Sequence, residues 1–221
     1  ARGVVAGAGE SIAAASPSAP AGADVVVEPG EYRERLILRD GVRVISRIPR
    51  AAILRLPGSA SEGEGAVVAR GPMTSELVGF RIVGDAATPL GTGIVVRDAA
   101  LAIVNCEVTG AVQAALDLGG TAAAVIGSDI HDNPGPAMAI RSGAGPRVTH
   151  NFFARNGLSS RLAAAIDIER GARPYVAGNV FEGLAPIGVV DERLRRSLQQ
   201  DNWFVGSRRT EPAPAPNGRD R

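Results

Sequence analysis

A six-residue pattern recurs along the chain and constrains its fold more than any other feature. Each copy begins and ends with an apolar residue, and five copies align without gaps. Their starting residues, separated by 26, 22, 23 and 28 positions, are Leu77, Ile103, Val125, Val148 and Val176. A looser sixth copy ends at Phe204. A period of this length indicates a solenoid, in which each repeat forms one coil that packs against its neighbours.

Each copy is followed by two apolar residues separated by one position. These pairs are Ile94/Val96, Leu116/Leu118, Met138/Ile140, Ile166/Ile168 and Ile187/Val189. Their period of two is typical of a strand with one buried side, whereas a helical repeat would need apolar spacings of three and four residues. The sequence therefore predicts that every coil contains at least two strands.

The fourth position of the six-residue pattern becomes polar along the chain. In successive copies it is Phe80, Cys106, Ser128, Asn151, Asn179 and Asn202. Asparagine side chains stacked at one turn can hydrogen-bond from coil to coil as a ladder. We therefore interpret the three asparagines as structural and not catalytic, and His150, just before the first of them, as a turn residue.

The repeats and the residues before them resemble the pectin-lyase-like superfamily of right-handed β-helices, including its generic parallel β-helix repeat members. Residues 24–34 are similar to a first coil, and residues 10–15 to the short helix that caps it. The resemblance covers about residues 10–205. It implies an all-β, single-stranded right-handed parallel β-helix of about 6–8 coils with a short N-terminal capping helix.

Both ends of such a solenoid expose strand edges that need protection against aggregation. The helix at residues 10–15 would cover one end, and residues 191–198 can form two helical turns near the other. Residues 207–221 are polar and rich in proline, with nothing to bury. We therefore expect an N-terminal segment with the capping helix (1–23), a β-helix (24–206) and a flexible tail (207–221).

Composition excludes several classes of function. The net charge of +1 gives no indication of a nucleic-acid partner, and no run approaches the ~20 apolar residues of a membrane span, so we expect no membrane insertion. Every basic side chain apart from the two histidines is arginine, which excludes chemistry that needs a lysine amine. Cys106 is the single cysteine, so the chain has no internal disulfide and no Cys/His zinc site. The compartment stays open, with a secreted or extracytoplasmic location slightly favoured.

The main candidate site lies on outward positions of the second strand. Asp117 and Asp167 stack two coils apart, about 10 Å at ~4.8 Å per coil, with Arg141 diagonal to both. The connections at residues 83–93 and 154–165 are longer than those between them. We expect these connections to wall a groove floored by Asp117 and Arg141, whose side chains point into solvent.

Three interpretations of this groove remain open. A glycoside hydrolase would use Asp117 and Asp167 as its paired carboxylates, although Arg141 beside them favours their ionised forms and opposes a general acid. The resemblance to pectate lyases implies instead that Asp117, Asp167 and Glu169 hold Ca²⁺ against a uronate carboxylate while an arginine takes the proton. In the third interpretation Arg141 bridges acids on a solvated face. Candidate binding residues around the groove are Arg97, Glu169, Arg155 and Arg161.

A second candidate lies on the outward side of the six-residue pattern. Asp129 and His131 are two positions apart, close enough for a carboxylate to orient an imidazole. Residues 128–133 resemble the Asp/His-rich active strand of alginate epimerases. Acidic and amide residues are also common in turns between strands, which leaves a structural alternative open.

An apolar strip is predicted further along the same side, formed by Phe152, Val180 and Trp203. Exposed, it would bind a ligand or partner, and Trp203 could stack on a sugar ring. We expect it to be covered by residues 184–200 or by the tail.

Our leading hypothesis is a noncatalytic β-helix module that binds a carbohydrate or a protein partner, within a larger multidomain protein or alone. The alternative is a polysaccharide lyase or glycoside hydrolase acting on a uronate-containing polymer, centred on Asp117, Arg141 and Asp167. A purely structural spacer is a third hypothesis. We expect no cofactor and assign no metal ligands, with Ca²⁺ entering only if the chain is a lyase. The oligomeric state is left open.

Overall fold

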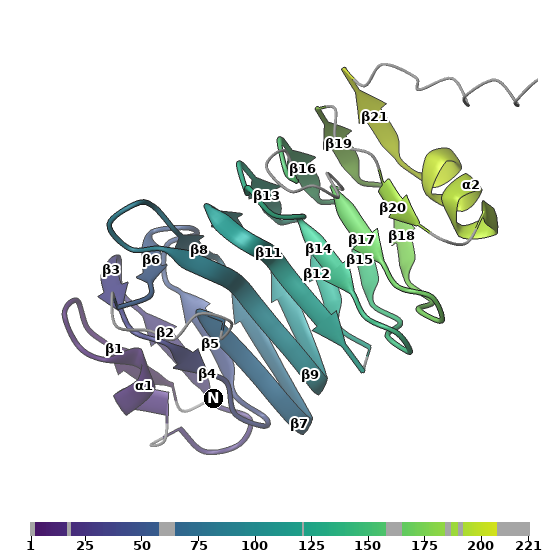
Figure 1. Cartoon of the computed structure of the whole chain (residues 1–221). Helices are drawn as coiled ribbons and strands as arrows, with labels where there is room; N and C mark the ends of the chain where they lie inside the picture. The colour runs from purple at the N-terminus through teal and green to yellow at the C-terminus, as the bar shows by residue number, and fades with distance from the viewer. Residues whose placement is uncertain are drawn as a thin grey trace, which may run out of the picture.

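The computed structural model describes residues 3–16, 19–57, 65–120, 122–157, 165–183, 187–189 and 192–206. The chain forms a right-handed parallel β-helix in which each coil pairs with the coil before it and the coil after it (Figure 1). The predicted fold class is thereby confirmed. The strands belong to a 13-stranded and an 8-stranded sheet, and because the larger sheet bends around a corner, the solenoid has three faces.

The first face belongs to the 13-stranded sheet and carries the first strand of each six-residue copy. It contains β1 (Val4–Ala6), β2 (Asp24–Val27), β5 (Arg43–Ser46), the C-terminal ends of β7 (Val67–Val78) and β9 (Leu90–Val104), β12 (Ala124–Ile126), β15 (Arg147–Thr149) and β18 (Tyr175–Ala177).

The second face is the 8-stranded sheet, which carries the last residues of each copy. It contains β3 (Gly30–Arg33), β6 (Ala52–Arg55), β8 (Phe80–Val83), β10 (Glu107–Thr109), β13 (Asp129–His131), β16 (Phe152–Ala154), β19 (Val180–Glu182) and β21 (Trp203–Val205).

The third face carries the predicted second strands. It contains β4 (Leu36–Ile37), the N-terminal parts of β7 and β9, β11 (Ala111–Gly119), β14 (Met138–Ile140), β17 (Ile166–Ile168) and β20 (Ile187–Val189).

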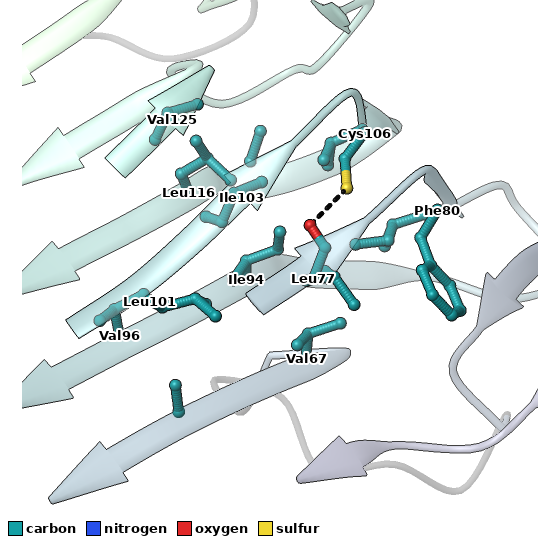
Figure 2. Packing of buried hydrophobic residues seen from close by; sticks show 14 of the residues in the cluster. Val67, Leu77, Phe80, Ile94, Val96, Leu101, Ile103, Cys106, Leu116 and Val125 are labelled. Carbon is teal, nitrogen blue, oxygen red and sulfur yellow. Dashed lines mark hydrogen bonds between the residues drawn. The ribbon is translucent and has the colours of Figure 1, made fainter. Parts of the chain in front are cut away.

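The interior is filled by the apolar residues that the repeat predicts. Leu116 pairs with Met138 and Met138 with Ile166, in the expected register, and all three side chains are fully buried. Figure 2 shows this packing between Val67 and Val125, where the Cys106 thiol donates to the Leu77 carbonyl oxygen at 3.5 Å. Burial raises the pKa of the Cys106 thiol to about 11, which keeps it protonated. A one-residue shift in pairing would turn these apolar side chains outward, so burial fixes the register.

A tight turn with one left-handed residue separates the first face from the second. The left-handed φ angles at this position, between 51° and 70°, belong to Gly79, Asn105, Gly127, His150 and Gly178. Glycine is favoured there because a Cβ is unfavourable at positive φ. The turn assigned to His150 is therefore confirmed.

The predicted asparagine ladder follows this turn. Asn151 donates through Nδ2 to Asn179 Oδ1 at 2.9 Å, and Asn179 donates to Asn202 Oδ1 at 2.8 Å. The backbone N–H of Asn151 also donates to Asn179 Oδ1, at 2.9 Å. A shorter ladder that the sequence analysis missed joins Asn133 Nδ2 to Asn156 Oδ1 at 2.8 Å, beyond the second face. Both ladders satisfy polar groups that lie almost completely inside the molecule.

Short helices lie near both ends (Figure 1). The expected N-terminal helix is α1 (Ile12–Ala15), whose first N–H groups, at Ile12 and Ala13, donate to the Glu34 carboxylate. Helix α2 (Glu192–Asp201) includes most of the predicted C-terminal helix and accepts a hydrogen bond from Gly178 N–H at Asp201 O. Strand β1 already pairs with β2, so the sheet extends beyond the boundary proposed at residue 24. The proposed tail, residues 207–221, lies outside the described residues.

Among the described residues, neither helix combines the length and the apolar character that crossing a membrane requires.

Candidate functional site

The third face carries the main site predicted from sequence. Its outward column reads Val95, Asp117, Ala139, Asp167 and Gly188, in the predicted register. Asp117 and Asp167 are thus two coils apart, with Ala139 between them. The expectation that the Asp117 side chain points into solvent is wrong: the residue is 8% exposed, because the arginines on either side cover its carboxylate.

Asp117 is held by two arginines from neighbouring coils. Arg97 Nη2 donates to Oδ2 at 2.6 Å, while Arg141 donates from Nε to Oδ1 at 2.8 Å and from Nη2 to Oδ2 at 3.0 Å. Burial alone would raise the pKa of Asp117, but the hydrogen bonds from Arg141 and Arg97 outweigh it and hold the pKa below its ordinary value. The carboxylate is therefore ionised at neutral pH, with both oxygens occupied.

Arg141 extends this chain of ion pairs to the next coil. Its Nη1 donates to Glu169 Oε1 at 2.9 Å, and Glu169 Oε2 accepts from the Ser142 backbone N–H at 2.9 Å. The hydrogen bond from Arg141 lowers the pKa of Glu169, and the bond to Asp117 raises the pKa of Arg141 further above its ordinary value. Arg97, Asp117, Arg141 and Glu169 form what we call the ion-pair ladder, with two positive and two negative charges.

Asp167 does not join this ladder. It is partly exposed and, within the part of the chain that the structure describes, its side chain makes no hydrogen bond or ion pair. The described residues also contain no group of three or more His, Cys, Asp or Glu side chains that could hold a metal ion. The Ca²⁺ ligand set implied by the resemblance to pectate lyases, Asp117 with Asp167 and Glu169, is therefore not assembled.

On the second face, the structure changes the partner of His131. Asp129 was expected to orient the imidazole, but its Oδ2 accepts instead from Arg50 Nη1 at 2.7 Å. His131 Nδ1 lies 2.7 Å from Asp132 Oδ2, and its Nε2 lies 3.5 Å from Glu107 Oε1. Asp132 contacts the imidazole because it follows His131 in a left-handed turn, with φ of 53°, which directs its side chain toward the ring.

Arg155 was expected to line the wall of the groove, and it binds Asp132 instead. The contact has two hydrogen bonds, from Nε to Oδ1 at 2.6 Å and from Nη2 to Oδ2 at 2.8 Å. These bonds lower the pKa of Asp132 to about 2, with a smaller contribution from His131. Arg161, the other arginine assigned to that wall, lies outside the described residues.

The apolar strip of Phe152, Val180 and Trp203 forms in the expected register. Trp203 is 64% exposed, so no segment that the structure describes provides the expected covering over this residue. Helix α2 contacts β18, β20 and β21 at the end of the solenoid without burying the indole. Beneath the strip, the rings of Phe153, Phe181 and Phe204 stack at centroid distances of 4.8 and 5.0 Å.

The sequence analysis missed a cationic surface at the corner between the third and first faces. Arg170 and Arg173 are exposed in the turn before β18, and Arg147 is exposed on β15, with its guanidinium carbon 4.8 Å from the centre of the Tyr175 ring. None of the three arginines is paired with a carboxylate in the described ranges. We call these four residues the arginine corner. Arg147 and Tyr175 each stand directly before a copy of the repeat, in two successive coils. This shared position could have indicated from the sequence that the two side chains lie side by side.

Comparison with solved structures shows the fold. An alginate lyase from Paenibacillus sp. str. FPU-7 superposes with a TM-score of 0.65 at 15% identity, over 85% of this chain and 69% of that chain. A mutant of the PL6 family alginate lyase AlyGC gives a TM-score of 0.55, also at 15% identity, over 93% of this chain and 39% of the other. This chain thus spans well under half the length of the second protein. No curated protein sequence matches the chain.

Comparison with protein families gives a direct sequence match. The family model described as "Right handed beta helix region" matches residues 92–204, which is just over half of the chain. The matched range contains most of the strands that carry the ion-pair ladder, the asparagine ladders and the arginine corner. The chain therefore belongs to the right-handed β-helix family.

Proposed function

We propose that this chain is a noncatalytic β-helix module that binds an acidic polysaccharide at the arginine corner. The observation that carries the proposal is the exposure of Arg147, Arg170 and Arg173 close together at one corner, without carboxylate partners among the described residues. Guanidinium groups bind carboxylates with two parallel hydrogen bonds, which suits uronate sugars. Tyr175 adds an aromatic surface with a polar tip beside them.

The spacing of the coils supports a polymeric ligand. Arg147 and Tyr175 are on adjacent strands, and Arg173 N–H donates to Ala144 O at 2.8 Å, which joins the two turns that precede these strands. Neighbouring coils repeat every ~4.8 Å along the solenoid axis. Positive charges are therefore arranged along the axis, where a chain with a carboxylate on each sugar can meet more than one of them.

The ion-pair ladder supports a noncatalytic role. A general acid needs a protonated carboxyl at the working pH, and a general base needs an accessible lone pair. Asp117 offers neither, because two arginines occupy its oxygens and keep it ionised. The competing function is a polysaccharide lyase, which draws support from the names of the two structural neighbours, both alginate lyases.

Binding is tested with alginate and with an uncharged dextran of similar length, by isothermal titration calorimetry. We expect the wild type to bind alginate and not dextran, with affinity that falls as salt screens the guanidinium groups. The Arg170→Gln/Arg173→Gln variant should weaken alginate binding at least ~10-fold, about 1.4 kcal/mol. The matched control is Arg33→Gln/Arg47→Gln, two exposed arginines near the other end of the solenoid. Equal affinity in the corner variant and the wild type would exclude the arginine corner as the binding site.

Catalysis is tested on the same polymers by measuring 4,5-unsaturated ends and new reducing ends, with and without Ca²⁺. We expect no product from the wild type. A Ca²⁺-dependent product that disappears in Asp117→Asn, at a temperature where circular dichroism shows the variant folded, would establish the lyase instead.

A further inference from the structure

The first face carries an unbroken stripe of aliphatic side chains that point away from the interior. One residue on each of six consecutive strands, paired in register, contributes to it. The members of this aliphatic stripe are Val5, Val26, Ile45, Val78, Val104 and Ile126. At ~4.8 Å between strands, the stripe is about 24 Å long.

No described segment covers this stripe. Val5 is 51% exposed and the other five members are partly exposed. Outward valines on the third face are much less exposed than the stripe: Val68 is 6% exposed and Val95 is 3% exposed. Helix α2 contacts β18, β20 and β21 at the end of the solenoid and does not lie over the stripe (Figure 1). A continuous exposed apolar surface of this kind marks an interaction site.

A second outward column runs beside the stripe, two residues earlier on each strand. In the order of the coils it reads Asp24, Arg43, Glu76, Ala102, Ala124, Arg147 and Tyr175. The two alanines lie side by side. Glu76 and then Arg43 precede them, while Arg147 and then Tyr175 follow them. Apart from Asp24, which pairs with Arg43 within the chain, the column is therefore complementary to its own reverse about a point between β9 and β12.

We propose that the first face is a dimer interface occupied by a second copy of this chain. The two copies are related by a two-fold axis that is parallel to the strands and passes between β9 and β12. This rotation places column against column with the order of coils reversed, and in the stripe it sets Val104 against the second copy's Ile126. Val78 then faces Thr149 of the second copy and Ile45 faces its Ala177, while Val5 and Val26 extend beyond its β18. Ala102 then faces the second copy's Ala124, Glu76 faces its Arg147, and Arg43 faces its Tyr175. Such a self-complementary contact is the usual form of a two-fold interface.

Charge selects this arrangement over the other face-to-face dimer. A two-fold axis along the solenoid would place the column of one copy against the aliphatic stripe of the other. Asp24 would then lie against Val26, and Glu76 against Val78. Burying these charges against apolar side chains is costly, whereas the proposed axis gives an opposite-charge pair and a cation–π pair in each half.

The size of the face indicates a weak dimer. Its outward surface is two residues wide on each strand, so the contact belongs to the smaller class of specific interfaces. We therefore expect monomer at ~1 µM and a substantial dimer fraction at ~300 µM. Arg147 and Tyr175 belong both to this interface and to the arginine corner, so polysaccharide binding and dimer formation should compete. Sedimentation without polysaccharide measures the dimer by itself, whether or not the proposed function holds.

The test is sedimentation equilibrium of the wild type and charge-swapped variants over this concentration range. Glu76→Arg and Arg147→Glu should each weaken the dimer at least ~10-fold, about 1.4 kcal/mol. The double variant restores opposite charges across the two-fold axis and should return the dissociation constant to within ~3-fold of the wild type. Val104→Lys should abolish the dimer, while the control Thr109→Lys, on the second face, should leave it unchanged.

Circular dichroism confirms that each variant is folded before its association is interpreted. A wild type that stays monomeric at ~300 µM overturns the proposal. So does a double charge swap that is no better than either single swap, because the pairing of Glu76 with Arg147 is specific to the proposed axis.

Discussion

The asparagine ladder should contribute a large part of the stability of the C-terminal coils. Asn179 is completely buried, and its side chain makes five hydrogen bonds. Oδ1 accepts from the backbone and side-chain nitrogens of Asn151, both at 2.9 Å, and the two hydrogens of Nδ2 are shared among Val148 O, Ala177 O and Asn202 Oδ1. Asn179→Ala removes all five and leaves the Asn151 backbone N–H without its acceptor.

The expected cost follows from these contacts. An orphaned buried donor costs about 1–3 kcal/mol, and each of the remaining bonds contributes about 1 kcal/mol net, part of which nearby groups recover. We therefore expect Asn179→Ala to lower the free energy of unfolding by about 3 kcal/mol. Asn202→Ala should cost somewhat less, because Asn202 makes four such contacts in place of five and is 8% exposed, so water can reach the groups that it leaves.

Urea denaturation with two probes measures this cost. Far-UV circular dichroism follows all coils, and the fluorescence of Trp203, the only tryptophan, follows the strand next to β19. In Asn179→Ala the urea midpoint should fall by about 1 M, with the fluorescence transition preceding the dichroism transition because solenoid coils can unfold separately. Midpoints within ~0.2 M of the wild type by both probes would refute the reasoning.

Two further predictions follow from the core and from the second face. Ile140→Ala, at a fully buried position between Leu118 and Ile168, should cost about 2–5 kcal/mol by leaving a cavity, whereas Asp167→Ala should leave the thermal midpoint almost unchanged. Arg155 lowers the pKa of Asp132 to about 2, so their contact stabilises the fold above the ordinary aspartate pKa near 4, and this contribution disappears as pH falls toward 2. Carbon NMR of the Asp132 carboxyl should show titration near 2 in the wild type and a higher pKa in Arg155→Gln; titration near 4 in both would contradict the contact.

The coils were predictable because their evidence is periodic. Leu77, Ile103 and Val125 repeat at near-constant spacing, and apolar burial at a period of two leaves one register for each strand. The tight turn was predictable for the same reason, because Asn151 and Asn179 are the fourth residues of two successive copies of the pattern.

The partners of outward side chains were less predictable. A two-residue spacing suggested that Asp129 orients His131, but the backbone angles of the turn direct Asp132 to the ring, and Arg50, 79 residues earlier, takes Asp129. Sequence alignment of the repeats identifies which residues share a face. It does not give the reach of a long arginine to the neighbouring coil, which decides that Asp117 is buried and paired.

The ion-pair ladder also bears on how the coils find their order during folding. Successive coils offer each other nearly the same backbone hydrogen bonds and the same aliphatic surface, so a coil that stacks on the wrong neighbour loses little of either. If β14 skipped β11 and stacked on β9, Arg141 would lie beside Arg97 with no carboxylate between them. Like charges on adjacent strands repel, and the mis-stacked chain would also expose the displaced coil. The alternation of Arg97, Asp117, Arg141 and Glu169 thus favours the native order of the coils that carry it, whereas β7 and β9 place Arg70 beside Arg97 and gain no such selection.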